Sequence, residues 1–427
     1  MPDNGNQTRP VRTLTVKNFS VIKEATLEFG KITVLIGPQA SGKSLLCKLA
    51  YFLGQILPTM IEESWKKHVP FDVFIRQISL DFVEKFPENS WTDQQFKIGY
   101  IYDDFSVRVE KSGQDHLPQF RFSPEFVSEY EGWSIAGPGV SRDIVPSRIR
   151  KQLEREGGKI SGLPIVEESV YIPTGRSFYS ITNRAYAILS TKNLDWIMQA
   201  YAPRFDADYK ALRDSYNTDM PMLSEFGKIA TRILKGRVIS EDGRLVFESI
   251  EDSRSRPFEI LSSGALELLP LINSLSQITK HARYPDIPTM PVPPFGVVYI
   301  EEPELSVFPS TQAALIRLFV WLAQAPSLWM SFAITTHSPY ILSAFDNLIK
   351  AGVVGNSSEE HRVAVNKIVD EKYWIRPEDF RAYKIVDGKL DSIYNPETGD
   401  LDADYLDNIS GEIAAEFSNL LEIQYGK

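Results

Sequence analysis

One loop restricts the possible folds of this chain more than any other feature. Residues 35–46 read LIGPQASGKSLL, and the run KITVLIG that leads into them is nearly continuous in β-branched residues, as in a buried central strand. The loop matches the pattern G-x-x-x-x-G-K-[ST] at Gly37, Gly42, Lys43 and Ser44. The apolar stretch LLCKLAYFLGQIL that follows favours a helix beginning inside the loop. A strand, a glycine loop and a helix in this order predict a phosphate-binding loop in an α/β protein.

The residue types of this loop fit the chemistry of a nucleotide. Glycines let backbone N–H groups turn toward phosphate oxygens, and the start of the helix adds partial positive charge. We expect Lys43 to reach the β- and γ-phosphates and the Ser44 hydroxyl to ligate Mg²⁺. The predicted nucleotide-binding residues of the loop are Gly37, Pro38, Gln39, Ala40, Ser41, Gly42, Lys43, Ser44 and Leu45.

A pair of acids follows a second apolar strand. The segment GVVYIEEPE (296–304) places Glu301 and Glu302 at the carboxyl end of that strand, where α/β sheets bind ligands. We expect Glu301 to hold Mg²⁺, directly or through water, and Glu302 to polarise the attacking water as a general base. Two acids after a strand are common in themselves, and they become specific only beside a phosphate loop.

Two further segments add groups suited to a phosphate site. LSSGALELL (261–269) puts Ser263 and Gly264 at a helix start, whose N–H groups can bind an anion or serve as an ordinary helix cap. MSFAITTHSPYIL (330–342) is an apolar strand that ends near His337. A single histidine is usually structural, but at the end of a strand next to the phosphate loop it can hydrogen-bond a γ-phosphate or the attacking water.

In this order and spacing, the four segments resemble the motifs of ABC-type ATPases of the SMC, RecF and OLD kind. GPQASGKS is similar to Walker A, LSSGALE to the signature loop, VVYIEEPE to Walker B, and TTHSP to the switch histidine. The resemblance implies an α/β ABC-type P-loop ATPase head, with a mixed sheet and flanking helices, that hydrolyses ATP with Mg²⁺. It also implies that Ser263 and Gly264 face the γ-phosphate of another subunit, so that the chain forms a dimer or higher homo-oligomer.

Three departures from the family pattern stand out. Gln39-Ala40 replaces a frequent Asn-Gly, Glu301 stands where aspartate is usual, and LSVFP after Glu304 replaces a histidine-containing segment. None of them removes a group that phosphate binding needs, although the last leaves the D-loop region unassigned. The sequence also does not identify the Q-loop glutamine of such ATPases.

Four parts are expected along the chain. They are an N-terminal ATPase lobe with Walker A (1–110), an inserted, largely helical lobe (111–236), a C-terminal ATPase lobe with signature, Walker B and switch histidine (237–350), and a small α+β extension (351–427). Within them we predict a helical segment at 62–95, hairpins at 96–110 and 237–250, and a closing helix near 403–423.

Composition limits the partners. The net charge of −10 opposes binding of a phosphate backbone over the whole surface. The basic residues gather at Arg142, Arg148, Arg150, Lys151, Arg155 and Lys159, where interleaved glutamates favour a solvated helix face over a nucleic-acid patch without excluding the latter. The single cysteine, Cys47, fits a reducing cytosol. Gln324 and Pro326 interrupt the apolar stretch 318–336, so we expect no membrane span and a cytoplasmic location.

Three classes of ATPase were compared. A transporter engine is disfavoured because 220 residues separate Ser44 from Gly264. A DNA-repair or chromosome-associated head is the alternative, but it predicts a basic groove or coiled-coil arms, and no sustained heptads occur. The favoured class is a sensor and scaffold of an anti-phage defence system, since the short head and the C-terminal segment resemble OLD-like ATPases such as those of PARIS systems. The resemblance implies a separate toxic effector, a nuclease, and a phage protein as a possible trigger.

Two acidic fragments imitate the motifs of a Toprim nuclease domain. They are VDGKLD (386–391) and DLDAD (400–404). The chain ends at residue 427, only 36 residues after Asp391, which leaves no room for the strands and helices that such a domain needs. We therefore expect this chain not to be the nuclease itself.

Overall fold

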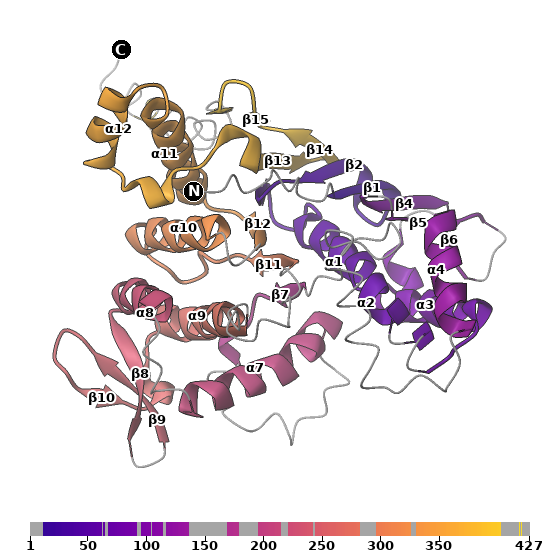
Figure 1. Cartoon of the computed structure of the whole chain (residues 1–427), viewed down its shortest axis with the longest axis horizontal. Coiled ribbons are helices and arrows are strands. Elements are labelled where there is room, and N and C mark those ends of the chain that lie inside the picture. The colour runs from indigo at the N-terminus through magenta and orange to yellow at the C-terminus, as the bar shows by residue number, and fades with distance from the viewer. Residues whose placement is uncertain are drawn as a thin grey trace.

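The computed structural model of the chain describes most of its residues. These are residues 12–61, 63–64, 67–91, 95–103, 105–113, 117–135, 169–178, 195–214, 221–241, 244–281, 296–325, 330–402, 418 and 420. The basic cluster at 142–159 and nearly all of the predicted closing helix lie outside these residues. Figure 1 shows the arrangement of the helices and strands.

Eleven of the described strands form one large mixed sheet. Its eleven strands lie in the order β6-β5-β4-β1-β2-β14-β13-β3-β12-β11-β7. In chain order they are β1 Arg12–Phe19, β2 Ile22–Phe29, β3 Ile32–Ile36, β4 Phe96–Tyr102, β5 Phe105–Lys111, β6 Gln119–Phe122, β7 Val170–Ile172, β11 Val297–Glu301, β12 Ser331–Thr336, β13 Phe380–Val386 and β14 Lys389–Ser392.

The sheet has a parallel half and an antiparallel half. Strands β13, β3, β12, β11 and β7 run parallel to one another. Strands β2, β1, β4, β5 and β6 pair antiparallel, each with the next in this order. Every residue of β3, β11 and β12 is buried, whereas β1 and β4 alternate between buried and more exposed residues. The parallel half is therefore covered on both faces and the antiparallel half on one.

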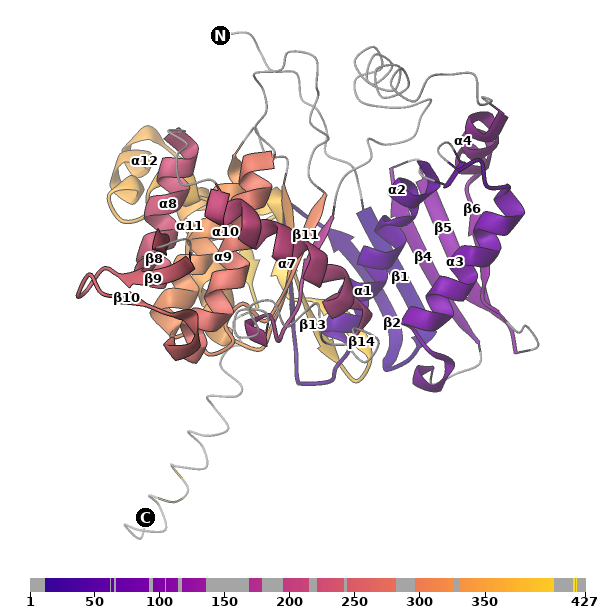
Figure 2. The same ribbon diagram turned by 90° about the horizontal axis from the view of Figure 1, so that it is seen from below.

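Helices supply that cover. They are α1 Lys43–Gly54, α2 Ile56–Ile61, α3 Phe71–Lys85, α4 Pro124–Ile135, α7 Trp196–Asp214, α8 Pro221–Leu234, α9 Ser263–His281, α10 Pro309–Gln324, α11 Pro339–Gly355 and α12 Glu359–Asn366. Leu35 packs with α1 to α4 in an aromatic-rich core, and the adjacent Val34 packs with α8 to α11 in a second core. Because neighbouring residues of a strand point to opposite faces, these two cores lie on opposite sides of the sheet (Figure 2).

The predicted fold class, an α/β P-loop body with a mixed sheet and flanking helices, is confirmed. The helix predicted over 62–95 was too long, since the described helix in that range is α3, with only a 3₁₀ turn at Glu88–Ser90 after it. Pro70 precedes α3 in an extended conformation and Pro87 follows it, and proline favours both kinds of break.

The predicted middle and C-terminal parts contribute strands to the large sheet and helices that pack on it. From the range 111–236, β6 extends the antiparallel half, β7 forms the other edge of the sheet, and α7 and α8 pack on α9. From the range 351–427, the hairpin of β13 and β14 inserts between β2 and β3. The predicted four-part division stays a prediction, because these contacts do not test whether any part folds alone.

Smaller elements complete the described structure. Strands β8 Gly236–Glu241, β9 Arg244–Ser249 and β10 Ser255–Arg256 form a small antiparallel sheet just before α9. The first two are the predicted 237–250 hairpin. Strands β15 Tyr394–Asn395 and β16 Asp400–Leu401 form a short ribbon against α11. The apolar stretch 318–336 divides into the end of α10 and strand β12, and none of the described helices has the length and hydrophobicity to cross a membrane.

Candidate nucleotide-binding site

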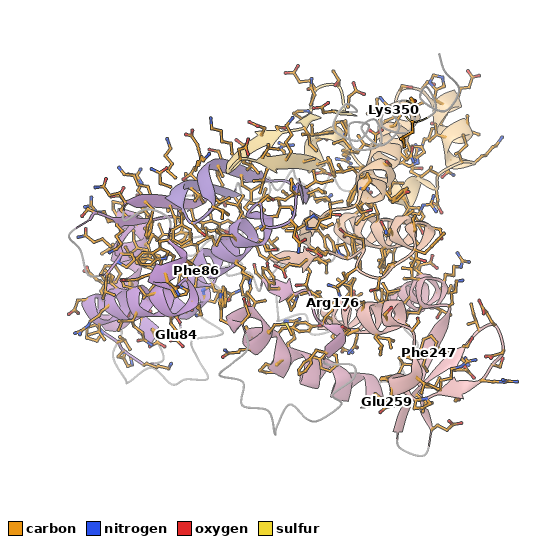
Figure 3. All side chains as sticks on the ribbon, turned by 180° about the vertical axis from the view of Figure 1, so that it is seen from behind. Glu84, Phe86, Arg176, Phe247, Glu259 and Lys350 are labelled. Carbon is orange, nitrogen blue, oxygen red and sulfur yellow. The ribbon has the colours of Figure 1, made fainter. Side chains whose placement is uncertain are left out.

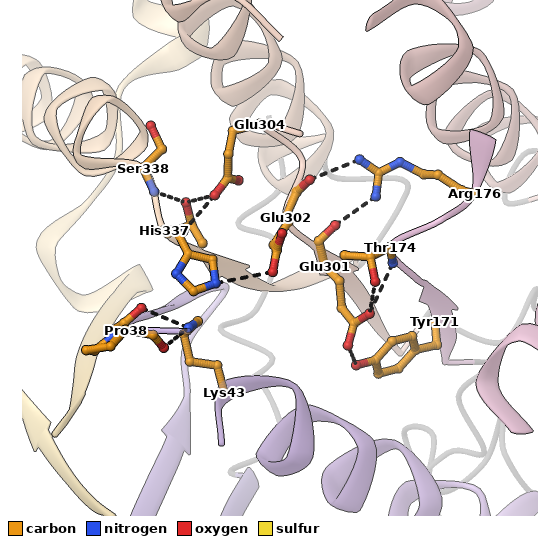
Figure 4. Close-up of polar contacts among 12 residues, drawn as sticks. Pro38, Lys43, Tyr171, Thr174, Arg176, Glu301, Glu302, Glu304, His337 and Ser338 are labelled. Atoms are coloured by element: carbon orange, nitrogen blue, oxygen red, sulfur yellow. Dashed lines mark hydrogen bonds and ion pairs between the residues drawn. The ribbon is translucent and has the colours of Figure 1, made fainter. Parts of the chain in front are cut away.

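Three neighbouring parallel strands bring the predicted motifs to one edge of the sheet. Strand β12 lies between β3 and β11, with Thr336 opposite Ile36 and Thr335 opposite Glu301. The glycine loop follows β3, His337 follows β12, and Glu302 follows β11, so all three meet at the carboxyl edge (Figure 4). Open α/β sheets bind ligands at this edge.

The glycine loop has a geometry that only certain residues allow. A Cβ on Gly42 would lie 2.4 Å from Ile22 Cδ1, and Gly42 has a φ of +104°. A Cβ on Gly37 would lie 2.7 Å from the carbonyl oxygen of Ile385 in β13. Ala40 has a φ of +60°, in the left-handed region that glycine prefers. Glycine is thus the residue that this position favours, and Ala40 carries some strain.

Lys43 lies folded over the loop. Its Nζ donates hydrogen bonds to the carbonyl oxygens of Gly37 and Pro38, both at 2.8 Å. The side chain is largely buried, and this burial lowers the pKa of Lys43, while the nearby carboxylates of Glu302 and Glu304 act in the opposite direction. The ammonium of Lys43 is thus held at the glycine loop by two neutral carbonyl oxygens, with the two acids nearby.

The side chains of the two neighbouring glutamates diverge, with Glu301 directed at Tyr171 and Glu302 at His337 (Figure 4). Glu301 is buried, and its Oε1 accepts a hydrogen bond from the Tyr171 hydroxyl at 2.7 Å. Its Oε2 accepts from the Thr174 N–H at 3.1 Å and from the Thr174 hydroxyl at 3.2 Å. Burial raises the pKa of Tyr171 well above its usual value, so the hydroxyl stays protonated and able to donate.

Glu302 instead turns toward His337. It has a φ of +42°, in the left-handed region, directly after the last residue of β11. Its Oε1 lies 3.2 Å from His337 Nε2, and both side chains are partly exposed, at 28% and 33%. A partly exposed carboxylate oriented by a histidine has the position expected of the predicted general base.

The chain around His337 is held by the loop that follows β11. Glu304 Oε1 accepts hydrogen bonds from the Thr336 hydroxyl and from the His337 N–H, both at 2.7 Å. Gln312 in α10 accepts from the Ser338 hydroxyl at 2.6 Å and donates to the Val307 carbonyl at 2.8 Å. These bonds fix the ends of β11 and β12 relative to each other.

Three residues of the site were not anticipated from the sequence. Tyr171, Thr174 and Arg176 come from β7 and the turn after it, in the segment YIPTGRS. Arg176 is fully buried in the middle of the molecule (Figure 3) and donates to the carbonyl oxygens of Glu301 at 2.7 Å and Glu302 at 3.0 Å. An arginine placed directly after a proline–glycine turn at the end of an apolar strand was the available signal.

Ser263 and Gly264 form the first residues of α9, as predicted for the signature-like segment. The Ser262 hydroxyl accepts a hydrogen bond from the Ala265 N–H at 3.3 Å. A Cβ on Gly264 would lie 2.6 Å from the carbonyl oxygen of Ser306, so the helix start packs tightly on the loop after β11. Within the described part of the chain, no hydrogen bond or ion pair joins Ser263 or Gly264 to the glycine loop.

The donor groups present fit a polar ligand. Ser41 Oγ and Thr335 Oγ1 are buried and have no hydrogen-bond partner among the described residues. Both lie where the glycine loop meets the end of β12, and buried polar atoms ordinarily find a partner. Glu301 Oε1 accepts a single hydrogen bond, which leaves it a lone pair for a metal or its water. No three His, Cys, Asp or Glu side chains of the described residues form a preformed metal cluster.

Comparison with known protein families agrees with this geometry. A family described as "AAA domain, putative AbiEii toxin, Type IV TA system" matches residues 32–343, which include the glycine loop, the start of α9, Glu301, Glu302 and His337. The chain belongs to this AAA family. The AAA-domain match covers strands β3, β12, β11 and β7 of the parallel half and the antiparallel strands β4 to β6, and it ends before β13 and β14.

Several solved structures are similar to this AAA-family chain at low identity. The SMC head domain from Thermotoga maritima has 12% identity and a TM-score of 0.39, over 90% of this chain and 98% of that one. An SMC head bound to the C-winged helix domain of ScpA has 11% identity and a TM-score of 0.41, over 90% of this chain and 97% of that one. The Pyrococcus furiosus Smc head with an extended coiled coil, bound to the C-terminal domain of ScpA, has 11% identity and a TM-score of 0.39, over 95% of this chain and 99% of that one. No curated protein matches the sequence.

Proposed function

We propose that this chain is a Mg²⁺-dependent ATPase that acts as sensor and scaffold in an anti-phage defence system and controls a separate toxic effector. The single observation that carries the ATPase part is the meeting of three groups at one sheet edge. Lys43, Glu302 and His337 come from the ends of three adjacent parallel strands, with Glu302 held 3.2 Å from the histidine. Membership of an AAA family supports the same activity.

Each group has a task in phosphoryl transfer. Backbone N–H groups of residues 39–44 and the amino end of α1 bind the phosphates, and Lys43 moves from its two carbonyl partners to the β- and γ-phosphates. Glu302 takes a proton from water as the water oxygen attacks the γ-phosphorus. The bond to the bridging β–γ oxygen breaks, and ADP and phosphate leave.

His337 orients the base. With Nε2 protonated, the imidazole donates to Glu302 Oε1 and leaves Oε2 for the water. Ser44 and Glu301 would hold Mg²⁺, which neutralises charge on the phosphates during transfer. Glu301 is one methylene longer than the usual aspartate, and its bonds to Tyr171 and Thr174 fix where that longer side chain ends.

A complete site requires more than one chain in this proposal. Ser263 and Gly264 lie at an exposed helix start whose N–H groups suit an anion, yet they have no bond to the glycine loop of their own chain. Nearby Phe308 is 75% exposed and Tyr340 is 57% exposed, which gives this edge apolar side chains for a second copy to cover. We expect a dimer or a higher homo-oligomer.

The effector part rests on two supports. The description of the AAA family names a putative toxin of a type IV toxin–antitoxin system, which fits a role beside a toxic partner. The acidic fragments near the C-terminus have structural tasks, since Asp387 lies in the hairpin turn, Asp400 pairs with Lys350 at 2.7 Å, and Asp402 lies 3.8 Å from Lys384. A separate nuclease, released or activated when a phage protein is sensed, remains the proposed effector.

Hydrolysis by the purified chain tests the ATPase proposal. We expect Mg²⁺-dependent release of phosphate from ATP that Lys43→Ala abolishes, because the variant leaves the β- and γ-phosphate charge without its cation. Lys48→Ala is the matched control, since Lys48 lies on the same helix and pairs with Asp195 at a partly exposed position. Equal hydrolysis by Lys43→Ala and the wild type would reject the site.

Two further measurements test assembly and effector. Light scattering should find at least a dimer, and dilution over about a hundredfold should lower the rate per chain as the oligomer dissociates. The chain alone, with Mg²⁺ or Mn²⁺ and ATP, should leave DNA and RNA intact. Cleavage that disappears in Asp402→Ala would instead make this chain a nuclease.

A further inference from the structure

Arg176 is a buried charge with an unusual set of partners. Its side chain is 0% exposed. Its guanidinium donates four hydrogen bonds, all to backbone carbonyl oxygens, which are those of Glu267 at 3.1 Å, Pro173 at 3.0 Å, Glu301 at 2.7 Å and Glu302 at 3.0 Å. These carbonyls belong to three separate segments, namely α9, the turn after β7, and the end of β11.

Only arginine can make this connection. Its planar fork presents five N–H donors in fixed directions, whereas lysine has one nitrogen on a flexible stem. Burial lowers the pKa of Arg176, and the Glu267 carboxylate, 3.4 Å from Nε, acts in the opposite direction. A buried ion pair is poor evidence of a contribution to stability, because apolar residues fill such space at least as well. The fixed geometry of the bonds is what arginine adds.

Arg176 joins two segments that have separate tasks in the proposed function. One is the backbone of Glu302, which has a φ of +42° and carries the proposed general base. The other is α9, whose first residues are Ser263 and Gly264, and Glu267 lies one turn further along. Gly264 also packs on Ser306 of the loop after β11, so α9 contacts that loop at a second point.

We propose that Arg176 is a positioning residue that couples Glu302 to the amino end of α9. A movement of the Glu302 backbone shifts the amino end of α9, and the reverse also holds, because one rigid guanidinium is hydrogen-bonded to both. Binding of ATP at a chain's own glycine loop thereby changes the position of the amino end of α9. In the proposed oligomer this end of α9 contacts a neighbouring copy. This inference rests on the proposed ATPase function and adds a route by which that site is regulated.

Hydrogen exchange combined with kinetics tests the coupling. In the wild type, ATP with Mg²⁺ should slow amide exchange both at residues 37–44 and at residues 263–267. In Arg176→Lys we expect the slowing at 37–44 to remain and that at 263–267 to disappear. The Kd for ATP and the KM should stay within about threefold, while kcat falls at least tenfold, because a misplacement of about 1 Å costs about 10²-fold in rate.

A second variant and a control keep the test decisive. Glu267→Gln removes the charge partner, keeps the backbone acceptor, and should give a smaller loss at 263–267. Arg362→Lys, at an exposed pair with Glu371, should leave all readouts unchanged. If Arg176→Lys does not fold, Glu267→Gln carries the test alone. The double variant should be no worse than Arg176→Lys, since both changes act on one link.

The outcomes separate the two proposals. If the wild type shows no effect of ATP on exchange at 37–44, the proposed function itself fails. If the wild type responds at both segments and Arg176→Lys, or Glu267→Gln in its place, retains the response at 263–267 with wild-type kcat, the coupling alone is rejected.

Discussion

The loops that follow β3 and β11 form opposite sides of the same site but are built differently. The hydrogen bonds of Lys43 in the glycine loop are local, since its Nζ donates to Gly37 and Pro38, six and five positions away. The loop after β11 is held from a distance, as Glu301 bonds to Tyr171 across 130 positions and to Arg176 across 125. The lysine of the glycine loop is thus held by local hydrogen bonds, although Gly37 and Gly42 pack closely on Ile385 and Ile22. The loop after β11 instead depends on polar bonds to elements far along the chain.

This difference predicts that damage to the two loops has different consequences. The largest expected effect separates binding from chemistry. Glu302→Gln should lower kcat by about 10²–10⁴-fold with ATP still bound, because an amide cannot take a proton from water. Lys43→Ala should lose ATP binding instead. Both are read by nucleotide titration beside phosphate release.

The neighbouring acid supplies the control for that prediction. Glu301→Gln should weaken the binding of Mg²⁺, so that hydrolysis needs a higher Mg²⁺ concentration. Glu301 is buried and accepts hydrogen bonds from Tyr171 and Thr174, whereas Glu302 lies beside His337. If Glu301→Gln traps uncleaved ATP and Glu302→Gln turns over normally, the roles of the two glutamates are reversed.

How far the site could be predicted from the sequence follows the same division. The glycine loop, Glu301, Glu302 and His337 each stand at a strand end, and strand ends are visible as breaks in apolar runs. Tyr171, Thr174 and Arg176 were missed because β7 has only three residues and its role depends on pairing with β11. The place of β13 and β14 between β2 and β3 likewise depends on long-range pairing, which no local pattern encodes.

The second prediction tests how much the hydrogen bond between Tyr171 and Glu301 adds to the free energy of unfolding. Tyr171→Phe removes the hydroxyl that donates to Glu301 and leaves a buried carboxylate with fewer partners. The free energy of unfolding should fall by about 1–3 kcal/mol, measured by denaturant titration. Tyr340→Phe, at a 57% exposed position, should change it by less than about 0.5 kcal/mol. Equal effects of the two substitutions would mean that the bond to Glu301 contributes nothing.

The third prediction tests the local construction. Ala40→Gly relieves a φ of +60° and should raise the unfolding free energy by a few tenths to about 1 kcal/mol while ATP binding persists. Ala313→Gly, inside α10, should lower it by roughly 0.5–1 kcal/mol. A thermal melt compares the two variants. Destabilisation of the same size at both positions would contradict the strain assigned to Ala40.

The smallest expected effect lies away from both loops and gives a baseline. The hydrogen bond from Lys350 lowers the pKa of Asp400, so the pair stabilises the β15–β16 ribbon above the ordinary aspartate pKa of 3.8. This contribution is lost as the pH falls through the lower folded-state pKa. The protection of amides 394–401, taken as their exchange rate relative to the intrinsic rate at each pH, should therefore fall on acidification, and Asp400→Asn should remove that dependence. Wild-type pH dependence in Asp400→Asn would assign the effect to another group.

A structure of the chain with Mg²⁺ and a slowly hydrolysed ATP analogue tests the central claim most directly. The account predicts the triphosphate on the N–H groups of residues 39–44, with Lys43 Nζ moved from the Gly37 and Pro38 carbonyls to the β- and γ-phosphates. Glu302 and His337 should face the γ-phosphate. A nucleotide bound elsewhere, or an empty glycine loop at saturating analogue with Lys43 still on those two carbonyls, would contradict it.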